Sequence, residues 1–296
     1  MMRIEHQQTE DERQAIIGVE GLERPLTLMH VTDSHMAAAD ERDPEVLEAA
    51  AQCQELFKGL TPGGVSPKQL FEQALERSNS LAVDCTILTG DIINFPARAA
   101  IEIIERGVNG LRGPWLYTLG NHDWHFPHLQ WCDATREQFY PRLAHLAGDS
   151  PAAQVMELGG VRLVVLDNSN YQVTGHQLDF LRGQLQTGEP CLLFVHIPLY
   201  TPALAPPVLE KWKAPIVMAA PGWTPQAADE WRVREADAST SACHALVTLG
   251  EADNLVGVFC GHVHFSHAGE VRPGRMQYVT REGFRGGYRL IRLEPL

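Results

Sequence analysis

A chain of 296 residues with 44% hydrophobic and 21% charged residues is long enough to bury the core of one large α/β domain or two small ones, so neither a disordered chain nor a mini-protein fits. Its 24 Lys and Arg against 37 Asp and Glu give a formal net charge of -13, which argues against nucleic acid or an anionic membrane surface as a partner. The 13 histidines are many for a chain of this length and are the composition feature that points most directly to a functional site.

The apolar stretches are too short to cross a bilayer, since the run 191–197 falls far short of the roughly 20 residues required. The N-terminal sequence MMRIEHQQTEDERQ is too charged for a secretory signal peptide. Six cysteines without C-x-x-C spacing, several of them in apolar runs, favour buried reduced thiols over disulfides. We therefore expect a protein that is not exported, has no membrane partner and works in the cytoplasm.

Short runs rich in Val, Ile and Leu alternate with segments of helical periodicity. An edge strand is expected at 15–19, and further strands at 26–32, 85–89, 115–119, 161–166, 191–197, 255–260, 276–280 and 288–293. Helix starts are indicated by Asp43 before Pro44 and by capping boxes at 66–69 and 174–177. Strands separated by helices imply crossover connections and largely parallel pairing.

Two segments depart from this alternation. The short Gly-rich link 282–287 predicts an antiparallel hairpin between the last two strands, and hence a mixed sheet. From 201 to 225, six prolines and little periodicity predict a long loop, which we interpret as a cap over a pocket; a well-packed surface loop is the alternative. No repeat or interdomain linker is visible, so residues 1–296 are expected to form a single domain.

Five of the expected strands end in residue types that bind metals. In chain order, these residues are Asp33 and His35, Asp91, Asn121 with His122 and Asp123, His196, and His262 with His264. Ligands of open α/β sheets bind beyond the carboxyl ends of the strands, so the five motifs can converge on one crevice although they span 33 to 264. Convergence is therefore a topological expectation.

The spacing and chemistry of these motifs point to a divalent cation. In Asp33-x-His35 and His262-x-His264 the i, i+2 separation lets two side chains leave the same side of an extended segment. Imidazole, carboxylate and amide oxygen together suit Mn, Fe or Zn better than thiolate-seeking metals, and no cysteine belongs to the set.

Taken in order, the motifs D-x-H, G-D, G-N-H-D, H and G-H-x-H resemble those of the calcineurin-like metallophosphoesterase family from about residue 26 to 264. The histidine of the first motif and the compact length look most like the bacterial class III cyclic-nucleotide phosphodiesterase and glycerophosphodiesterase branch. The resemblance implies an α/β fold, a four-layer αββα sandwich of two mixed β-sheets flanked by helices.

The resemblance also implies a site for two divalent ions. It assigns one ion to Asp33, His35, Asp91 and His264, and the other to Asp91, Asn121, His196 and His262. Asp91 would bridge them. Purple acid phosphatases, which the sequence resembles in part, have a tyrosine where this chain has Asn94, so a tyrosinate-bound Fe(III) is disfavoured.

The implied activity is hydrolysis of a small phosphate ester by a hydroxide that bridges the metals, with a phosphodiester favoured over a monoester. His122 would face the substrate and protonate the leaving oxygen or bind the phosphate, and Asp123 would orient His122 through a hydrogen bond. The two ions outweigh the two aspartates in charge, so the acidic composition does not exclude an anionic ester.

Other interpretations remain open at this point. Each ligand type taken alone could cap a strand end, the fold could be a non-catalytic metal-binding scaffold, or the chain could be a nuclease, which would require a basic track. His30 lies inside an apolar strand and is expected to be a hydrogen-bonded interior residue. Asn94 could reach the phosphate or support a ligand, and His125 could shape the pocket or pack beneath the next helix.

Overall fold

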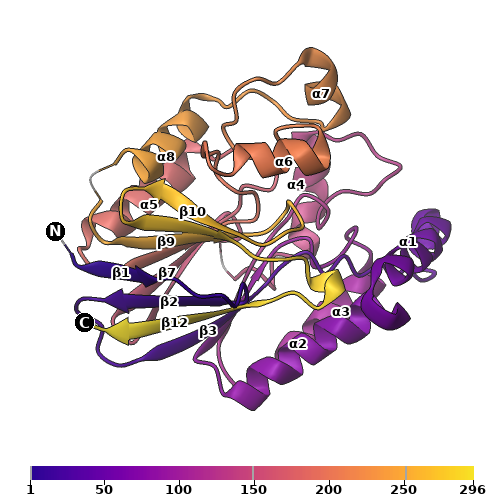
Figure 1. Ribbon diagram of the computed structural model, residues 1–296. Helices are drawn as coiled ribbons and strands as arrows, with labels where there is room; N and C mark the ends of the chain where they lie inside the picture. Colours follow the sequence, from indigo (N-terminus) through magenta and orange to yellow (C-terminus); the bar gives the residue numbers. More distant parts are fainter. Residues whose placement is uncertain (1, 149, 251) are drawn as a thin grey trace.

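The computed structural model describes residues 2–148, 150–250 and 252–296, which form two six-stranded sheets packed face to face (Figure 1). The first sheet has the order β1 (Ile4–Gln7), β2 (Gln14–Val19), β12 (Arg289–Pro295), β3 (Leu26–Val31), β4 (Cys85–Thr89) and β5 (Trp115–Thr118). The second has the order β10 (His267–Arg272), β11 (Arg275–Val279), β9 (Leu255–Cys260), β8 (Cys191–Phe194), β7 (Val161–Leu166) and β6 (Ala153–Leu158).

Helices cover the outer faces of both sheets, which confirms the expected four layers (Figure 1). The first sheet's side carries α1 (Leu47–Leu60), α2 (Pro67–Leu81), α3 (Arg98–Asn109) and α4 (Asp133–Phe139). The second carries α5 (Gly175–Gln186), α6 (Ala205–Trp212) and α8 (Ala238–Thr248), with α7 (Pro225–Glu230) between α6 and α8 in the chain. Short 3-10 helices are η1 (Pro44–Val46), η2 (Pro62–Gly64), η3 (Tyr140–Arg142) and η4 (Gly283–Arg285).

The core between the sheets is built from the strands' inward side chains, because alternate residues of a strand point to opposite faces. Leu28 and Ile87 of the first sheet belong to one buried cluster with Phe194 and Phe259 of the second. The two phenylalanine rings stack with their centroids 5.2 Å apart. Both capping boxes also form as predicted, at the starts of α2 and α5.

Parallel pairing dominates the middle of each sheet, as the alternation of strands and helices predicted. β3, β4 and β5 are parallel in the first sheet, and β7, β8, β9 and β11 are parallel in the second. The carboxyl ends of these strands therefore lie at shared edges, where the predicted ligands follow them.

The predicted hairpin between the last two strands is wrong. β11 pairs with β9 in the second sheet, whereas β12 crosses to the first sheet and lies between β2 and β3. The link between them contains η4 and turns at Gly286, which has a φ of 75°. A glycine-rich link allows either a reversal or a crossing, and burial of Ile291 and Leu293 between the sheets favours the crossing.

The strands β1, β6 and β10 were not predicted, and each of them lies at the edge of a sheet. β1 and β10 are edge strands with alternating exposed residues, and β6 at the opposite edge has no fully buried residue. Edge strands need less apolar sequence than central ones and natural proteins often make them polar. The apolar-run criterion therefore misses polar edge strands, although it finds the apolar edge strand β5; the strand expected at an edge, 15–19, is β2 and lies between β1 and β12.

The proline-rich segment 201–225 is partly helical, which corrects the expectation of a long loop. Pro206 and Pro207 lie in the first turn of α6, where a missing backbone N–H costs no hydrogen bond. Val208 and Ile216 are buried against the second sheet. The segment is thus anchored to the domain.

All six cysteines are free and four of them are buried, as expected from their positions. Among the described residues, no helix combines the length and apolarity that a membrane span requires.

Candidate metal centre

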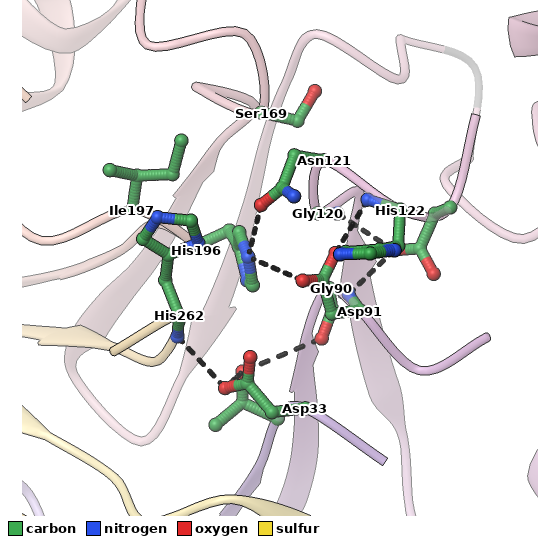
Figure 2. Close-up of polar contacts among 12 residues, drawn as sticks. Asp33, Gly90, Asp91, Gly120, Asn121, His122, Ser169, His196, Ile197 and His262 are labelled. Atoms are coloured by element: carbon green, nitrogen blue, oxygen red, sulfur yellow. Dashed lines mark hydrogen bonds and ion pairs between the residues drawn. The ribbon is translucent and has the colours of Figure 1, made fainter. Parts of the chain in front are cut away.

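The predicted ligands from five strand ends meet at one place between the two sheets (Figure 2). Asp33 and His35 follow β3, Asp91 follows β4, Asn121 follows β5, His196 follows β8, and His262 and His264 follow β9. The first four residues come from one sheet and the last three from the other, so the site joins the two sheets.

One group of donors consists of Asp33, His35 and His264. The His264 Nε2 lies 3.2 Å from Asp33 Oδ1 and 3.1 Å from His35 Nε2. The His35 Nε2 in turn lies 3.9 Å from Asp33 Oδ1. Three donors at these distances can surround one cation.

A second group consists of Asp91, His196 and His262. The His196 Nε2 lies 3.2 Å from Asp91 Oδ2 and 3.2 Å from Asn121 Oδ1. Asp91 Oδ2 also lies 3.8 Å from the Nε2 of His35, which belongs to the first group. This one carboxylate oxygen therefore lies between the two groups of donors.

The backbone at the ligands is unusual. Asp33, His35, Asp91, His262 and His264 all have positive φ values, between 46° and 70°. Non-glycine residues rarely adopt this left-handed conformation, and outliers of this kind cluster at functional sites. Five of the seven ligand candidates share it.

Two glycines make room for these carboxylates. A Cβ on Gly120 would lie 2.2 Å from Asp91 Oδ1, and a Cβ on Gly261 would lie 2.3 Å from Asp33 Oδ2. Any side chain at either position would displace a predicted ligand. Steric exclusion thus explains why the G-N-H-D and G-H-x-H motifs have glycine at their first positions.

Hydrogen bonds fix the orientation of three of the four ligand imidazoles. The His196 Nδ1 donates to the Thr89 carbonyl at 2.7 Å, and the His35 Nδ1 is bonded to Asn94 Oδ1 at 3.1 Å. The His262 Nε2 is bonded to the Tyr171 hydroxyl at 2.9 Å. Such partners hold the remaining ring nitrogen toward a metal.

Of these supporting residues, only Asn94 was predicted from the sequence as a possible support for a ligand. Thr89 acts through its backbone carbonyl, so its side-chain type carries no signal. Tyr171 lies in the loop after β7 and precedes its partner by 91 residues, so nothing local marks it.

Two of the ligand histidines are neutral, as metal binding requires, whereas His196 would release a proton when a metal binds. Burial lowers the pKa of His35 and of His262 to about 3, so both rings are neutral and have a free lone pair. Burial would raise the pKa of Asp91, but the charges of His196 and His122 hold it well below its usual range. Burial would also lower the pKa of His196, and the charge of Asp91 raises it to about 9.

One buried oxygen has no hydrogen-bond donor. Asp33 Oδ1 accepts no hydrogen bond from the described residues, although the other oxygen of this carboxylate accepts from the backbone N–H of His262 at 2.8 Å. Its nearest nitrogen is His264 Nε2 at 3.2 Å, another member of the same donor group. A buried carboxylate oxygen that accepts no hydrogen bond is costly, and a cation bound between these two groups would remove that cost. The donor set and this oxygen both fit a divalent metal.

His122 and Asp123 occupy different environments. The His122 ring centroid lies 4.8 Å from that of His35, and His122 lines the cavity beside the cluster. Asp123 is buried, and its carboxylate accepts hydrogen bonds from the backbone N–H groups of Asp91, Ile93 and Gly120 at 2.7 to 3.1 Å.

The expected hydrogen bond from Asp123 to His122 is not among those that the described residues form. The carboxylate is directed at the backbone amides because the turn after β4 and the turn after β5 both present N–H groups to it. Asp123 therefore holds the loops that carry Asp91 and Asn121 together. Burial and the charge of Asp91 raise its pKa to about 7.

Two phenylalanines pack against the first donor group. Phe57 of α1 stacks on His35 with centroids 5.0 Å apart and an angle of 15° between the ring planes. Phe284 of η4 contacts His35 and His264 edge-on, at 5.8 Å and 5.3 Å. These rings cover His35 and His264 with apolar surface, and no motif in the sequence marks either phenylalanine.

A cavity of about 230 Å³ lies beside the cluster. Its floor includes Asp91, Asn121, His122, His262 and His264. Its remaining walls carry aromatic and charged side chains, namely His125, Trp131, Tyr171, Trp212, Ile216, Glu230, Trp231 and Arg232. The expected cap at 201–225 contributes Trp212 and Ile216, and the covering continues to residue 232.

The sequence model of the calcineurin-like phosphoesterase family matches residues 26–266. The chain belongs to this family. The identification from the motifs is thereby confirmed. Curated relatives of this calcineurin-like phosphoesterase include a probable cyclic nucleotide phosphodiesterase of Rhodococcus erythropolis, 26% identical over 183 residues, or 58% of this chain and 52% of the relative.

A cAMP/cGMP dual specificity phosphodiesterase of Mycobacterium tuberculosis is 24% identical over 182 residues, or 58% of this chain and 49% of the relative. The matches thus span about half the length of these curated relatives.

Solved structures share the fold of this calcineurin-like phosphoesterase. A dimetal phosphatase from Danio rerio superposes with a TM-score of 0.54 at 14% identity, covering 88% of each chain. A purple acid phosphatase from yellow lupin gives a TM-score of 0.51 at 12% identity, covering 92% of this chain and 47% of the other. At these identities the likeness concerns the fold alone.

Proposed function

We propose that the protein is a metal-dependent phosphoesterase that hydrolyses a small phosphodiester. The observation that carries this proposal is the position of Asp91 Oδ2, 3.2 Å from His196 Nε2 and 3.8 Å from His35 Nε2, between two groups of metal-binding side chains. A single carboxylate shared by two ligand groups is the arrangement that a pair of adjacent cations requires.

The residues that would hold the cations follow from the two groups. Asp33, His35 and His264 would hold one, Asp91, Asn121, His196 and His262 the other, and Asp91 would contribute to both. When bound, two divalent ions supply Lewis acidity, which activates water and neutralises charge on a phosphoryl group. Mn, Fe and Zn all suit this donor set.

The chain's own contribution to the chemistry centres on His122. Its side chain lines the cavity next to the ligands, and its backbone N–H donates to Asp91 Oδ1 at 2.8 Å, which fixes its place. From there His122 would donate a proton or a hydrogen bond to the leaving oxygen of the ester. The Phe57 and Phe284 rings cover ligand imidazoles with apolar surface, which strengthens charge interactions within the cluster.

The names of the curated relatives support a diester as substrate, because both are phosphodiesterases of cyclic nucleotides. The cavity beside the cluster supports it too, since its walls leave space for an organic group beyond the phosphorus. The formal charge of -13 speaks against long nucleic acids. We place the protein in the cytoplasm and treat residues 1–296 as a single domain.

Hydrolysis of bis(p-nitrophenyl) phosphate and of p-nitrophenyl phosphate, on protein whose metal content has been quantified, tests the proposal. We expect release of nitrophenol from the diester with added Mn²⁺ and none after chelation. Two bound metals without turnover of either ester would instead identify a metal-binding scaffold.

A His122→Ala variant tests the assigned role of that residue. We expect full metal content with turnover lowered about 10²- to 10⁴-fold, the usual range for a general acid. If metal content fell together with activity, His122 would be a ligand, as its place within a third group of donors with His35 and Asp91 also allows.

A further inference from the structure

The cavity beside the metal ligands is lined by one arginine that forms no ion pair with the described residues. Apart from its histidines, the only basic residue lining the cavity, within the described part of the chain, is Arg232. It comes from the covering segment, whereas Asp91, Asn121 and His122 form the floor. A cation thus lies in the same small space as the proposed phosphoryl site.

The guanidinium of Arg232 is supported by an aromatic ring. It lies over Trp131, 5.8 Å from the ring centre. Trp131 is in turn packed against Trp124, with centroids 4.3 Å apart, and against His125 at 5.0 Å. Trp124 is buried and donates from Nε1 to Ser169 Oγ at 3.0 Å. Stacking on a fixed ring restricts Arg232 without using its N–H donors.

No carboxylate pairs with Arg232 among the described residues, although Glu230 lines the same cavity. The comparison with Arg234, two residues further on, is informative. Arg234 donates to both oxygens of Asp133, at 2.9 Å and 3.0 Å. Of these two nearby arginines, Arg234 is therefore occupied in a bidentate ion pair, whereas Arg232 has its donors available.

The backbone also favours a functional reason for an arginine at this position. Arg232 follows α7 with a φ of 56°, a left-handed conformation that glycine adopts most readily after a helix. Val233 donates back to the Ala228 carbonyl at 2.8 Å and is buried, which anchors the turn. The chain thus has an arginine at a position where the left-handed backbone would be less strained with glycine.

We propose that Arg232 is a substrate-binding residue that contacts anionic oxygens of the phosphoryl group from the side of the cavity opposite the metal ligands. The planar fork of a guanidinium matches two phosphoryl oxygens, which a point charge does not. This inference rests on the proposed function, because it takes a phosphate ester as the ligand of the cavity. Arg232 would then determine how tightly the ester binds, while Trp131 positions it.

The test compares Arg232→Gln and Arg232→Lys with the matched control Arg234→Gln. Two quantities are measured on protein with quantified metals: binding of inorganic phosphate by titration calorimetry, and kcat and KM for bis(p-nitrophenyl) phosphate. For Arg232→Gln we expect phosphate affinity to fall about tenfold or more and KM to rise by a similar factor, because a charge-assisted hydrogen bond is lost. Metal content and thermal midpoint should stay at the wild-type values.

Arg232→Lys should recover part of the phosphate affinity, and Arg234→Gln should remain within twofold of wild type. The proposal is overturned if Arg232→Gln binds phosphate within twofold of wild type, or if the Arg234 variant shows the same loss, which would indicate a general charge effect. The two proposals fail separately. If phosphate binding depends on Arg232 but no ester is hydrolysed, the proposed phosphoesterase activity is refuted. If an ester is hydrolysed equally well without Arg232, only the proposed role of Arg232 is refuted.

Discussion

Single residues at the metal centre combine strained backbone with side chains that approach one another closely. Five ligand candidates, among them Asp33 and Asp91, adopt positive φ without being glycine. Each such residue costs of order 1 to 3 kcal/mol, which the fold retains because the conformation directs the side chains into one space. Removal of the ligands therefore affects function more than folding.

Replacing Asp91 tests its place between the two groups of donors. In an Asp91→Ala variant we expect metal content to fall at both positions, because Asp91 Oδ2 lies near His196 of one group and His35 of the other. Metal analysis of the purified variant measures this, with Asp179→Ala on the exposed face of α5 as control. Retention of two full equivalents would contradict the shared role.

The buried His30, which is not a proposed metal ligand, makes the stability of the fold depend on pH. Its ring bonds to Thr280 Oγ1 at 2.7 Å and to Thr89 Oγ1 at 2.6 Å. Burial lowers its pKa from 6.5 to about 3, so between these values the unfolded chain binds the proton and the folded chain does not. This residue's contribution is fully present above pH 6.5 and declines as the pH falls.

We expect His30 alone to contribute up to about 1.4 kcal/mol per pH unit to the dependence of the unfolding free energy on pH below 6.5. Urea unfolding of the chelated protein at pH 7, 6 and 5 measures the slope. A His30→Gln variant should show a shallower slope by up to this amount, while His176→Gln on the exposed face of α5 serves as control. Equal slopes for His30→Gln and wild type would refute the assignment.

At the scale of elements, the turns that leave β4 and β5 depend on each other through Asp123. Its carboxylate accepts from Asp91, Ile93 and Gly120, so one side chain satisfies amides of two turns. The family resemblance implied a role for Asp123 in orienting His122 through a hydrogen bond. The folded turns reveal the role in holding the loops.

An Asp123→Ala variant should lose about 3 kcal/mol or more of unfolding free energy, because three buried amides lose their acceptor. Asp123→Asn should lose less, since its amide oxygen still accepts. Urea unfolding of both variants in metal-free form measures this. A change below about 1 kcal/mol for Asp123→Ala would show that water replaces the carboxylate.

At the scale of the whole molecule, the cluster links the two sheets. The first sheet supplies Asp33, His35, Asp91 and Asn121, and the second supplies His196, His262 and His264. A ligand that binds only the folded state stabilises it, by about 4 kcal/mol when its free concentration is a thousandfold above its dissociation constant.

Chelation should therefore lower the thermal midpoint by roughly 10 °C, and added Mn²⁺ should restore it. Scanning calorimetry before and after dialysis against a chelator measures the shift. A His264→Ala variant should show a smaller shift, because one position would already be weakened. No change in the midpoint on chelation would contradict metal binding across the sheets.

The sequence by itself determined most of the layered fold and the whole set of proposed ligands. Apolar runs mark strands buried on both faces, and parallel strands bring their carboxyl ends to a shared edge. The resemblance of the motifs to a known family then grouped residues of different sheets, such as Asp91 and His264, without coordinates. The tertiary structure alone decided the crossing of β12 to the first sheet, because a glycine-rich link permits either path and long-range packing selects one. It also decided which distant groups support the site: Tyr171, Phe57 and Arg232 approach it through contacts far apart in the chain, and such contacts leave no periodic trace in the sequence.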